Sequence, residues 1–325
     1  MPNSADARRA LRLEVLESAG AEPALVDELL AYGEAPPGDD VSPAELPLAD
    51  EPHVEAWLAY RREAREVGAE HTLKQHFAQF RFPVRTGISD DEAYRRATRK
   101  GVFEAALPFA PGATFSAPDR IDIDVLPTMG GRVPVIVAAD RSDFVTLVQA
   151  FTERNEPAAV PDTMGACMVR GFNNWSRIAA YRRQWAGSVD DANDAAWAEE
   201  FRRLVSRKAL YQDRFIILSR GAYSAIDADA VGLDRDDWLA RSLIIRREHE
   251  CTHYFTYRCL GSLRSHALDE LVADFVGLVH AFGRYSADVA LLFLGLERYP
   301  EYRPDGRLEN YWARAKLSRG AMSVV

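Results

Sequence analysis

The sequence predicts an α+β protein in which a mostly helical N-terminal region, residues 1–110, precedes a domain of mixed structure, residues 111–325. Three observations lead to this prediction. Apolar residues recur at helical spacing through most of the first hundred residues. Short runs rich in β-branched residues begin near residue 121 and predict a small mixed sheet. Two long helical patterns, each with capping residues, then occupy residues 235–283.

Helical periodicity covers most of the N-terminal third. The segments are residues 5–32, 51–67, 69–79 and 89–99. Gly20 and Pro23 are expected to divide the first segment into two helices. Ser89, which acidic residues follow, is expected to cap the last segment. Residues 33–50 are rich in Pro, Gly and Asp, and this composition predicts a loop or linker.

The middle of the chain alternates strand and helix signals. The predicted strands are 121–125, 135–139, 164–172 and 214–219, and the predicted helices are 141–153, 173–186 and 192–208. The segment from Met168 to Trp175 has two interpretations. It could be an edge strand on which an extended peptide adds as a further strand, or an ordinary strand-to-helix junction with an asparagine as N-cap. The second interpretation is favoured.

The last third is predicted to be helical. The helices are 235–260, 266–283, 287–296 and 310–316. Asp234 is a suitable N-cap for the first of these helices, and Gly261 is a suitable C-terminal residue. Ser265 is expected to cap the second helix, which is expected to end near Gly283.

The first of these helices contains the pattern His249-Glu250-Cys251-Thr252-His253. Successive residues of an α-helix are about 100° apart, so the two histidines lie about 40° apart, one turn along the axis. Both imidazoles can therefore reach one metal ion, and Glu250 points to the side where a bound water would lie. Glu270 and Asp274 share a face of the next helix. Two histidines, one carboxylate and an open fourth position are typical of a catalytic zinc site.

Apolar neighbours predict that both helices are buried. These neighbours are Leu243, Ile244, Ile245, Phe255, Leu271, Val272, Phe275 and Val276. Buried histidines and carboxylates without an ion or other partners would be costly in free energy. This argument favours a metal site over a chance occurrence of the motif.

The two motifs together resemble those of the gluzincin class of zinc metallopeptidases, to which thermolysin belongs; the similarity covers residues 235–283. The resemblance implies a zincin-like domain in which His249, His253 and Glu270 bind Zn²⁺ and Glu250 is the general base. It also implies that Asp274 accepts a hydrogen bond from a ligand histidine. The implied substrate is a peptide or a small amide.

The sequence departs from the gluzincin pattern at two positions beside the motifs. Glu248 precedes the first histidine, where the class usually has an uncharged residue, and Asp269 competes with Glu270 for the position of third ligand. A peptidase also needs a group that stabilises the oxyanion. The candidates are His266, His280, Tyr285, Tyr299 and Tyr302, with Arg284 as a cationic alternative, and their spacing does not choose among them.

Two other functions use the same residues. One is a zinc enzyme that acts on a non-peptide amide or ester in a biosynthetic pathway, and the other is a catalytically silent zincin-like scaffold that binds a partner. Glu250 argues against the scaffold, because a purely structural metal site has no use for a base beside an open coordination position.

Composition excludes several other classes of protein. The net charge of −9 argues against nucleic acid or an anionic membrane as the main partner. No segment has the roughly eighteen consecutive apolar residues that a membrane span requires. The three cysteines form no C-x-x-C unit, so a disulfide framework is not expected. With no secretion signal recognised, we expect a cytoplasmic protein.

Overall fold

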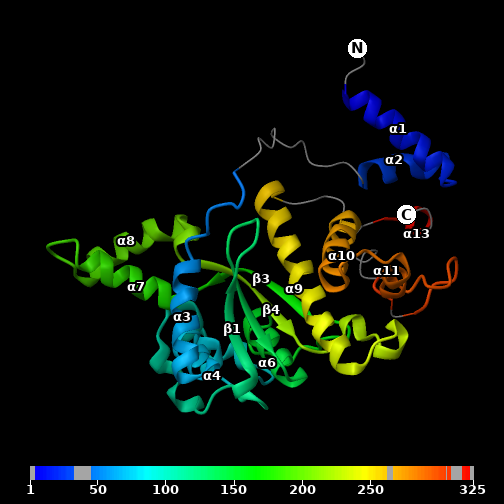
Figure 1. Cartoon of the computed structure of the whole chain (residues 1–325). Coiled ribbons are helices and arrows are strands. Elements are labelled where there is room, and N and C mark those ends of the chain that lie inside the picture. Colours follow the sequence, from blue (N-terminus) through cyan, green and yellow to red (C-terminus); the bar gives the residue numbers. More distant parts are fainter. Residues whose placement is uncertain (1–3, 33–44, 262–265, 305, 309–316, 323–325) are drawn as a thin grey trace. The chain divides into compact units, whose positions relative to one another are not determined.

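The computed structural model describes residues 4–32, 45–261, 266–304, 306–308 and 317–322 and confirms the α+β class (Figure 1). The chain divides by its contacts into two compact units. One is Leu46–Glu250, and the other combines Met1–Glu45 with Cys251–Val325. Helix α9, Arg235–Leu260, is continuous across this division. Among the described residues, no helix combines the length and the apolar character that crossing a membrane requires.

The unit Leu46–Glu250 contains a mixed sheet of four strands in the order β1-β2-β4-β3. The strands are β1 (Ile121–Leu126), β2 (Val133–Ala138), β3 (Ala166–Asn173) and β4 (Gln212–Ser219). Strand β2 pairs antiparallel with β1 and parallel with β4, and β3 pairs antiparallel with β4. The small mixed sheet predicted from the sequence is therefore present.

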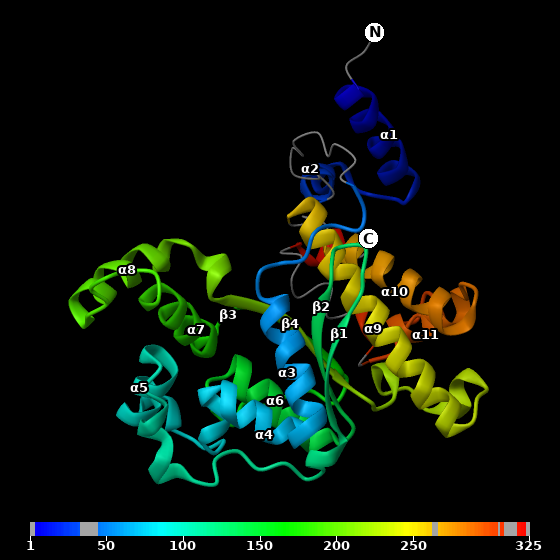
Figure 2. The same ribbon diagram turned by 60° about the vertical axis from the view of Figure 1, so that its left-hand side comes forward.

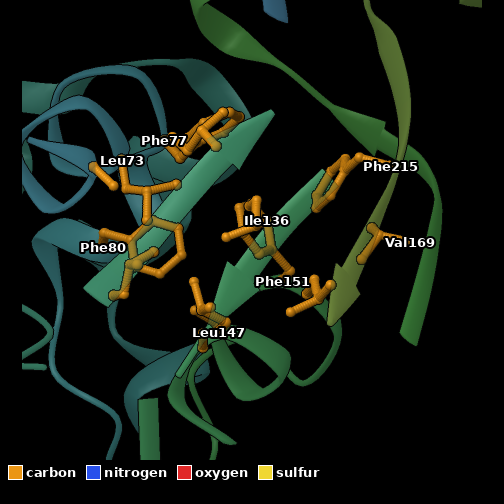
Figure 3. Packing of buried hydrophobic residues seen from close by; sticks show 14 of the residues in the cluster. Leu73, Phe77, Phe80, Ile136, Leu147, Phe151, Val169 and Phe215 are labelled. Carbon is orange, nitrogen blue, oxygen red and sulfur yellow. The ribbon is translucent and has the colours of Figure 1, made fainter. Parts of the chain in front are cut away.

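One face of the sheet carries the main hydrophobic core. The covering helices are α3 (Val54–Val67), α4 (Ala69–His76) and α6 (Arg141–Thr152). Figure 3 shows Phe77 and Phe80 from the N-terminal third packed with Phe151 and Phe215 around Ile136 of β2. Residues on both sides of position 110 thus contribute to one core.

The opposite face of the sheet is also buried. Val133 and Val135 of β2 and Ile216 and Leu218 of β4 are at most 1% exposed. The first part of α9 lies on this side, away from α3, in both views (Figures 1 and 2). Apolar residues on both faces explain why β2 and β4 have nearly continuous apolar sequences.

The remaining elements of this unit lie at its periphery. They are α5 (Glu92–Lys100), α7 (Trp175–Ala186) and α8 (Asp194–Ser206), with 3₁₀ turns at Ala78–Arg81, Ile88–Asp90, Phe103–Phe109, Pro118–Arg120, Lys208–Leu210, Tyr223–Ala225 and Ala228–Val231. Helices α7 and α8 form a hairpin between β3 and β4 that projects from the sheet (Figures 1 and 2). The hairpin has its own apolar cluster, which includes Ile178, Leu204 and Tyr211.

The other unit is helical in its described part. Besides the end of α9 it contains α1 (Ser4–Ser18), α2 (Pro23–Tyr32), α10 (His266–Phe282), α11 (Ala287–Leu294) and α13 (Arg319–Met322). The Tyr32 hydroxyl accepts a hydrogen bond of 3.1 Å from the backbone of Ala267, which joins α2 to the start of α10. The predicted cap Ser265, the predicted helix 310–316 and most of the predicted linker, residues 33–44, lie outside the described residues.

Helix ends follow the predicted caps in most places. Asp234 accepts a hydrogen bond of 2.9 Å from the backbone of Asp237, as an N-cap does. Gly261 and Gly283, with φ of 73° and 71°, follow the ends of α9 and α10 as predicted. The prediction for Ser89 is wrong. Helix α5 is capped by Asp91, because Ser89 belongs to the preceding 3₁₀ turn and its backbone N–H donates to Glu156.

A buried ion pair fixes the start of β4. Asp213 is 1% exposed, and its carboxylate accepts a hydrogen bond of 2.6 Å from Arg177 of α7. Asn174, the N-cap of α7, and Trp57 of α3 donate to the same carboxylate at 2.7 and 2.9 Å. The edge strand and the junction proposed for Met168–Trp175 are therefore both present, since β3 runs to Asn173 and Asn174 begins the helix.

Replacing Arg177 with methionine should lower the free energy of unfolding by about 3–5 kcal/mol, because it leaves the Asp213 carboxylate buried without its cation. Urea unfolding at pH 7 measures the loss. Arg182→Met on the same helix is the control, since its partner Asp194 is 96% exposed, and we expect a loss below about 1 kcal/mol. Equal losses in the two variants would contradict the importance of the buried pair.

Candidate metal centre

Most buried residues of helix α9 lie on one face. They recur every three or four positions and are Trp238, Ser242, Ile245, Arg246, His249, Thr252, His253 and Thr256, while Cys251 and Tyr254 are buried on the opposite side. This interval matches the 3.6-residue period of the helix. Both histidines of the motif lie on the buried face as a direct result of their spacing.

The structure brings together the three predicted ligands. One ligand atom each from His249, His253 and Glu270 lies within 4.8 Å of the other two, which is a group that could hold a metal ion. His249 and His253 are 6% and 9% exposed. The Nε2 atom of His253 lies 3.5 Å from Oε1 of Glu270.

His253 is oriented by a carboxylate from α10. Its Nδ1 atom lies 2.8 Å from Oδ2 of Asp269, and the hydroxyl of Thr256 donates to the other oxygen of Asp269 at 2.9 Å. Burial alone would raise the pKa of Asp269, but the hydrogen bonds and the charge of His253 outweigh it and lower the pKa. Asp269 was expected to compete for the position of third ligand. In the structure it holds the ring of His253, and Glu270 belongs to the ligand cluster.

Asp274 and Glu270 share a cation that the sequence analysis did not identify. Arg307 donates to Oδ1 of Asp274 at 2.7 Å and lies 3.1 Å from Oε2 of Glu270. Its side chain is 12% exposed. A hydrogen bond from a ligand histidine to Asp274 stays a prediction.

A close contact between two glycines places Arg307 beside α10. A Cβ atom on Gly306 would lie 2.4 Å from the carbonyl oxygen of Leu294, and one on Gly295 would lie 2.9 Å from Cα of Gly306. The next backbone N–H, that of Arg307, then donates to the carbonyl of Phe293. No sequence motif marks this arrangement, because Arg307 is one of several arginines that follow α11.

Glu250 follows the first histidine and is half-buried. Within the described part of the chain, its carboxylate makes no hydrogen bond or ion pair. Its charge also acts on β3. Burial raises the pKa of the Cys167 thiol to about 12, and the nearby negative charge of Glu250 adds to this rise. The beginning of the edge strand therefore lies within electrostatic range of Glu250.

The group of candidate ligands includes neither His280 nor Tyr285, two of the predicted oxyanion candidates. His280 is exposed and lies ten residues beyond Glu270, roughly 15 Å along α10. Tyr285 is 44% exposed and packs against Phe275, with ring centroids 5.3 Å apart. The side chain of His266 lies outside the described part of the structure.

The predicted burial of α10 is wrong for one of its faces. Leu268, Leu271, Val272 and Phe275 are 40–55% exposed. These residues recur at helical spacing on the side of α10 that faces away from Glu270 and Asp274. The apolar neighbours of Glu270 in the sequence therefore do not bury its carboxylate; contacts on the other face of the helix do.

The comparisons with known proteins concern the whole chain. A family model described as a family of unknown function (DUF7005) matches residues 14–325. The chain belongs to this family. No curated protein and no solved structure matches it. Membership of this family does not indicate an activity, so only the site bears on the function.

If the cluster holds the zinc ion that the sequence predicts, replacing Asp269 with alanine should weaken its binding about 10- to 100-fold, because His253 loses the group that fixes its ring plane and tautomer. Competition with a chromophoric chelator measures the affinity. Asp288→Ala, at an exposed position in the first turn of α11, should leave the affinity unchanged. An unaltered affinity in the Asp269 variant would show that the 2.8 Å contact does not orient the ligand.

Replacing Arg307 with methionine should destabilise the zinc-free protein by about 3–5 kcal/mol, because two carboxylates lose their cation. The loss should be smaller with zinc present, since the ion's charge acts on the same carboxylates. Urea unfolding with and without a chelator measures both values. Arg298→Met, at an exposed position, is the control. An equal loss with and without zinc would show that Arg307 and the ion do not share these carboxylates.

Proposed function

We propose that this protein is a zinc-dependent hydrolase, of the metallopeptidase type, that cleaves a peptide or amide bond. The observation that carries the proposal is the cluster of His249, His253 and Glu270, with Glu250 next to the first ligand on the same helix. Two imidazole nitrogens and one carboxylate oxygen form the donor set of catalytic zinc sites that keep an open position. A zincin-like fold is part of the same proposal.

The proposed chemistry divides between the ion and the side chains. Zinc, when bound, supplies Lewis acidity that lowers the pKa of water and polarises a carbonyl group. Glu250 takes the proton from the attacking water and returns it to the leaving amine. Asp269 holds His253 in a fixed orientation, and Arg307 limits the repulsion between Glu270 and Asp274.

An edge strand supports a peptide rather than a compact amide as the substrate. Strand β3 is at the end of the sheet and pairs with β4. An extended peptide can add to such an edge through backbone hydrogen bonds. The charge of Glu250 contributes to the raised pKa of Cys167, near the start of β3, after the larger effect of burial.

Metal analysis and a peptide-library digest test the proposal. We expect one zinc ion per chain and cleavage that Glu250→Gln reduces at least about 100-fold, the lower range for a positioned general base, while zinc stays bound. Glu248→Gln is the matched control: it makes the same change two residues away, at a carboxylate paired with Arg247. Absence of zinc would overturn the metal site. Zinc without Glu250-dependent cleavage of any peptide would overturn the peptidase assignment.

A further inference from the structure

The loop after β4 brings a tyrosine hydroxyl to the first metal-ligand histidine. The Oη atom of Tyr223 lies 3.3 Å from Nδ1 of His249. The two rings meet edge to face, with centroids 6.4 Å apart and planes at 61°. Tyr223 is 5% exposed, so this contact is made away from solvent.

Helix α9 itself holds this loop in place. The hydroxyl of Ser242 accepts a hydrogen bond of 3.0 Å from the backbone N–H of Tyr223. One turn earlier, the indole of Trp238 donates to the carbonyl of Ile226 at 2.7 Å. Trp238, Ser242 and His249 lie on the same face of the helix, so the contacts that hold the loop and the proposed ligand belong to one rigid element.

Arg246, one turn before His249, holds the other side of the loop. Its guanidinium donates to three carbonyls, those of Ser219, Gly221 and Ala222. The same group lies over the Tyr223 ring, 5.5 Å from the centroid. Arg246 is 4% exposed, so the carbonyls and the ring replace its contacts with water.

Gly165 gives Arg246 the space it needs. A Cβ atom at this position would lie 2.1 Å from Nε of Arg246, which is closer than any two such atoms can approach. The residue just before β3 therefore lacks a side chain where the guanidinium must pass. Any larger residue would displace Arg246 from the carbonyls of the loop.

The loop has a backbone conformation that L-residues rarely adopt. Ser224 and Ala225, directly after Tyr223, have φ of 53° and 54°. Two successive non-glycine residues in the left-handed region persist only where surrounding contacts fix them. The hydrogen bonds that the loop makes with Trp238, Ser242 and Arg246 are such contacts. The position of the Tyr223 hydroxyl is thus determined by the fold of the loop and of α9.

We propose that Tyr223 is a positioning residue for the metal ligand His249. A neutral imidazole carries one N–H and one lone pair, and a metal ion takes the lone pair. With Nδ1–H donating to Oη of Tyr223, Nε2 is the atom that binds the ion, and the ring plane is fixed toward it. This inference rests on the proposed function only in requiring that the site binds zinc.

Tyr223→Phe separates this role from simple packing, because phenylalanine keeps the ring and removes only the hydroxyl. We expect its zinc affinity to fall about 10- to 100-fold, measured by competition with a chromophoric chelator. The visible spectrum of the cobalt-substituted protein should also change. Tyr211→Phe is the matched control, since it removes a buried hydroxyl, bonded to the carbonyl of Val205, at the other end of β4. Its zinc affinity should stay within about twofold, because the Tyr211 hydroxyl donates to a backbone carbonyl and not to a ligand histidine.

A second variant keeps the tyrosine and loosens the loop. Ser242→Ala removes the acceptor for the backbone of Tyr223, and we expect a smaller loss of zinc affinity than in Tyr223→Phe. Unchanged affinity and an unchanged cobalt spectrum in both variants, with zinc bound to the wild type, would overturn this inference and leave the metal site standing. Failure of the wild type to bind zinc would instead overturn the proposed function, and the inference with it.

Discussion

A buried imidazole that binds a metal ion through one nitrogen must satisfy its other nitrogen within the protein. In this structure the two histidines of α9 meet that requirement in different ways. His253 has the carboxylate of Asp269, which comes from the next helix, and His249 has the hydroxyl of Tyr223, which comes from the loop after β4. The contacts that orient the two candidate ligands therefore join α9 to the loop that follows β4 and to α10.

The same requirement explains the charges on α10. Asp269, Glu270 and Asp274 place three carboxylates within six residues on a partly buried surface. Each has a counter-charge or donor: the ring of His253 for the first, and the guanidinium of Arg307 for the other two. Repulsion among the carboxylates would oppose folding without these partners. A zinc ion would add positive charge at the same place, so the helix is suited to the ion without depending on it entirely.

The sequence predicted the features that depend only on the spacing of residues along one helix. The shared face of His249 and His253 follows from 3.6 residues per turn, and the bounds of α9 follow from Asp234 and Gly261 at its ends. Tyr223 and Arg307 were missed because each lies in irregular chain, 26 residues before His249 and 37 after Glu270. Their positions depend on tertiary contacts that no spacing encodes. The exposure of the apolar face of α10 was missed for a related reason. The spacing of apolar residues identifies that face, but it does not show whether another part of the protein covers it.

The contacts around His249 bear on whether the site is catalytic or structural. Structural zinc sites are commonly organised by the ion, and the chain around them is unfolded without it. The position of His249 is instead set by direct protein contacts: Trp238, Ser242 and Arg246 hold a strained loop, and the loop holds the tyrosine. These contacts fit the catalytic site proposed above, because such a site requires ligands that the protein holds in a fixed orientation.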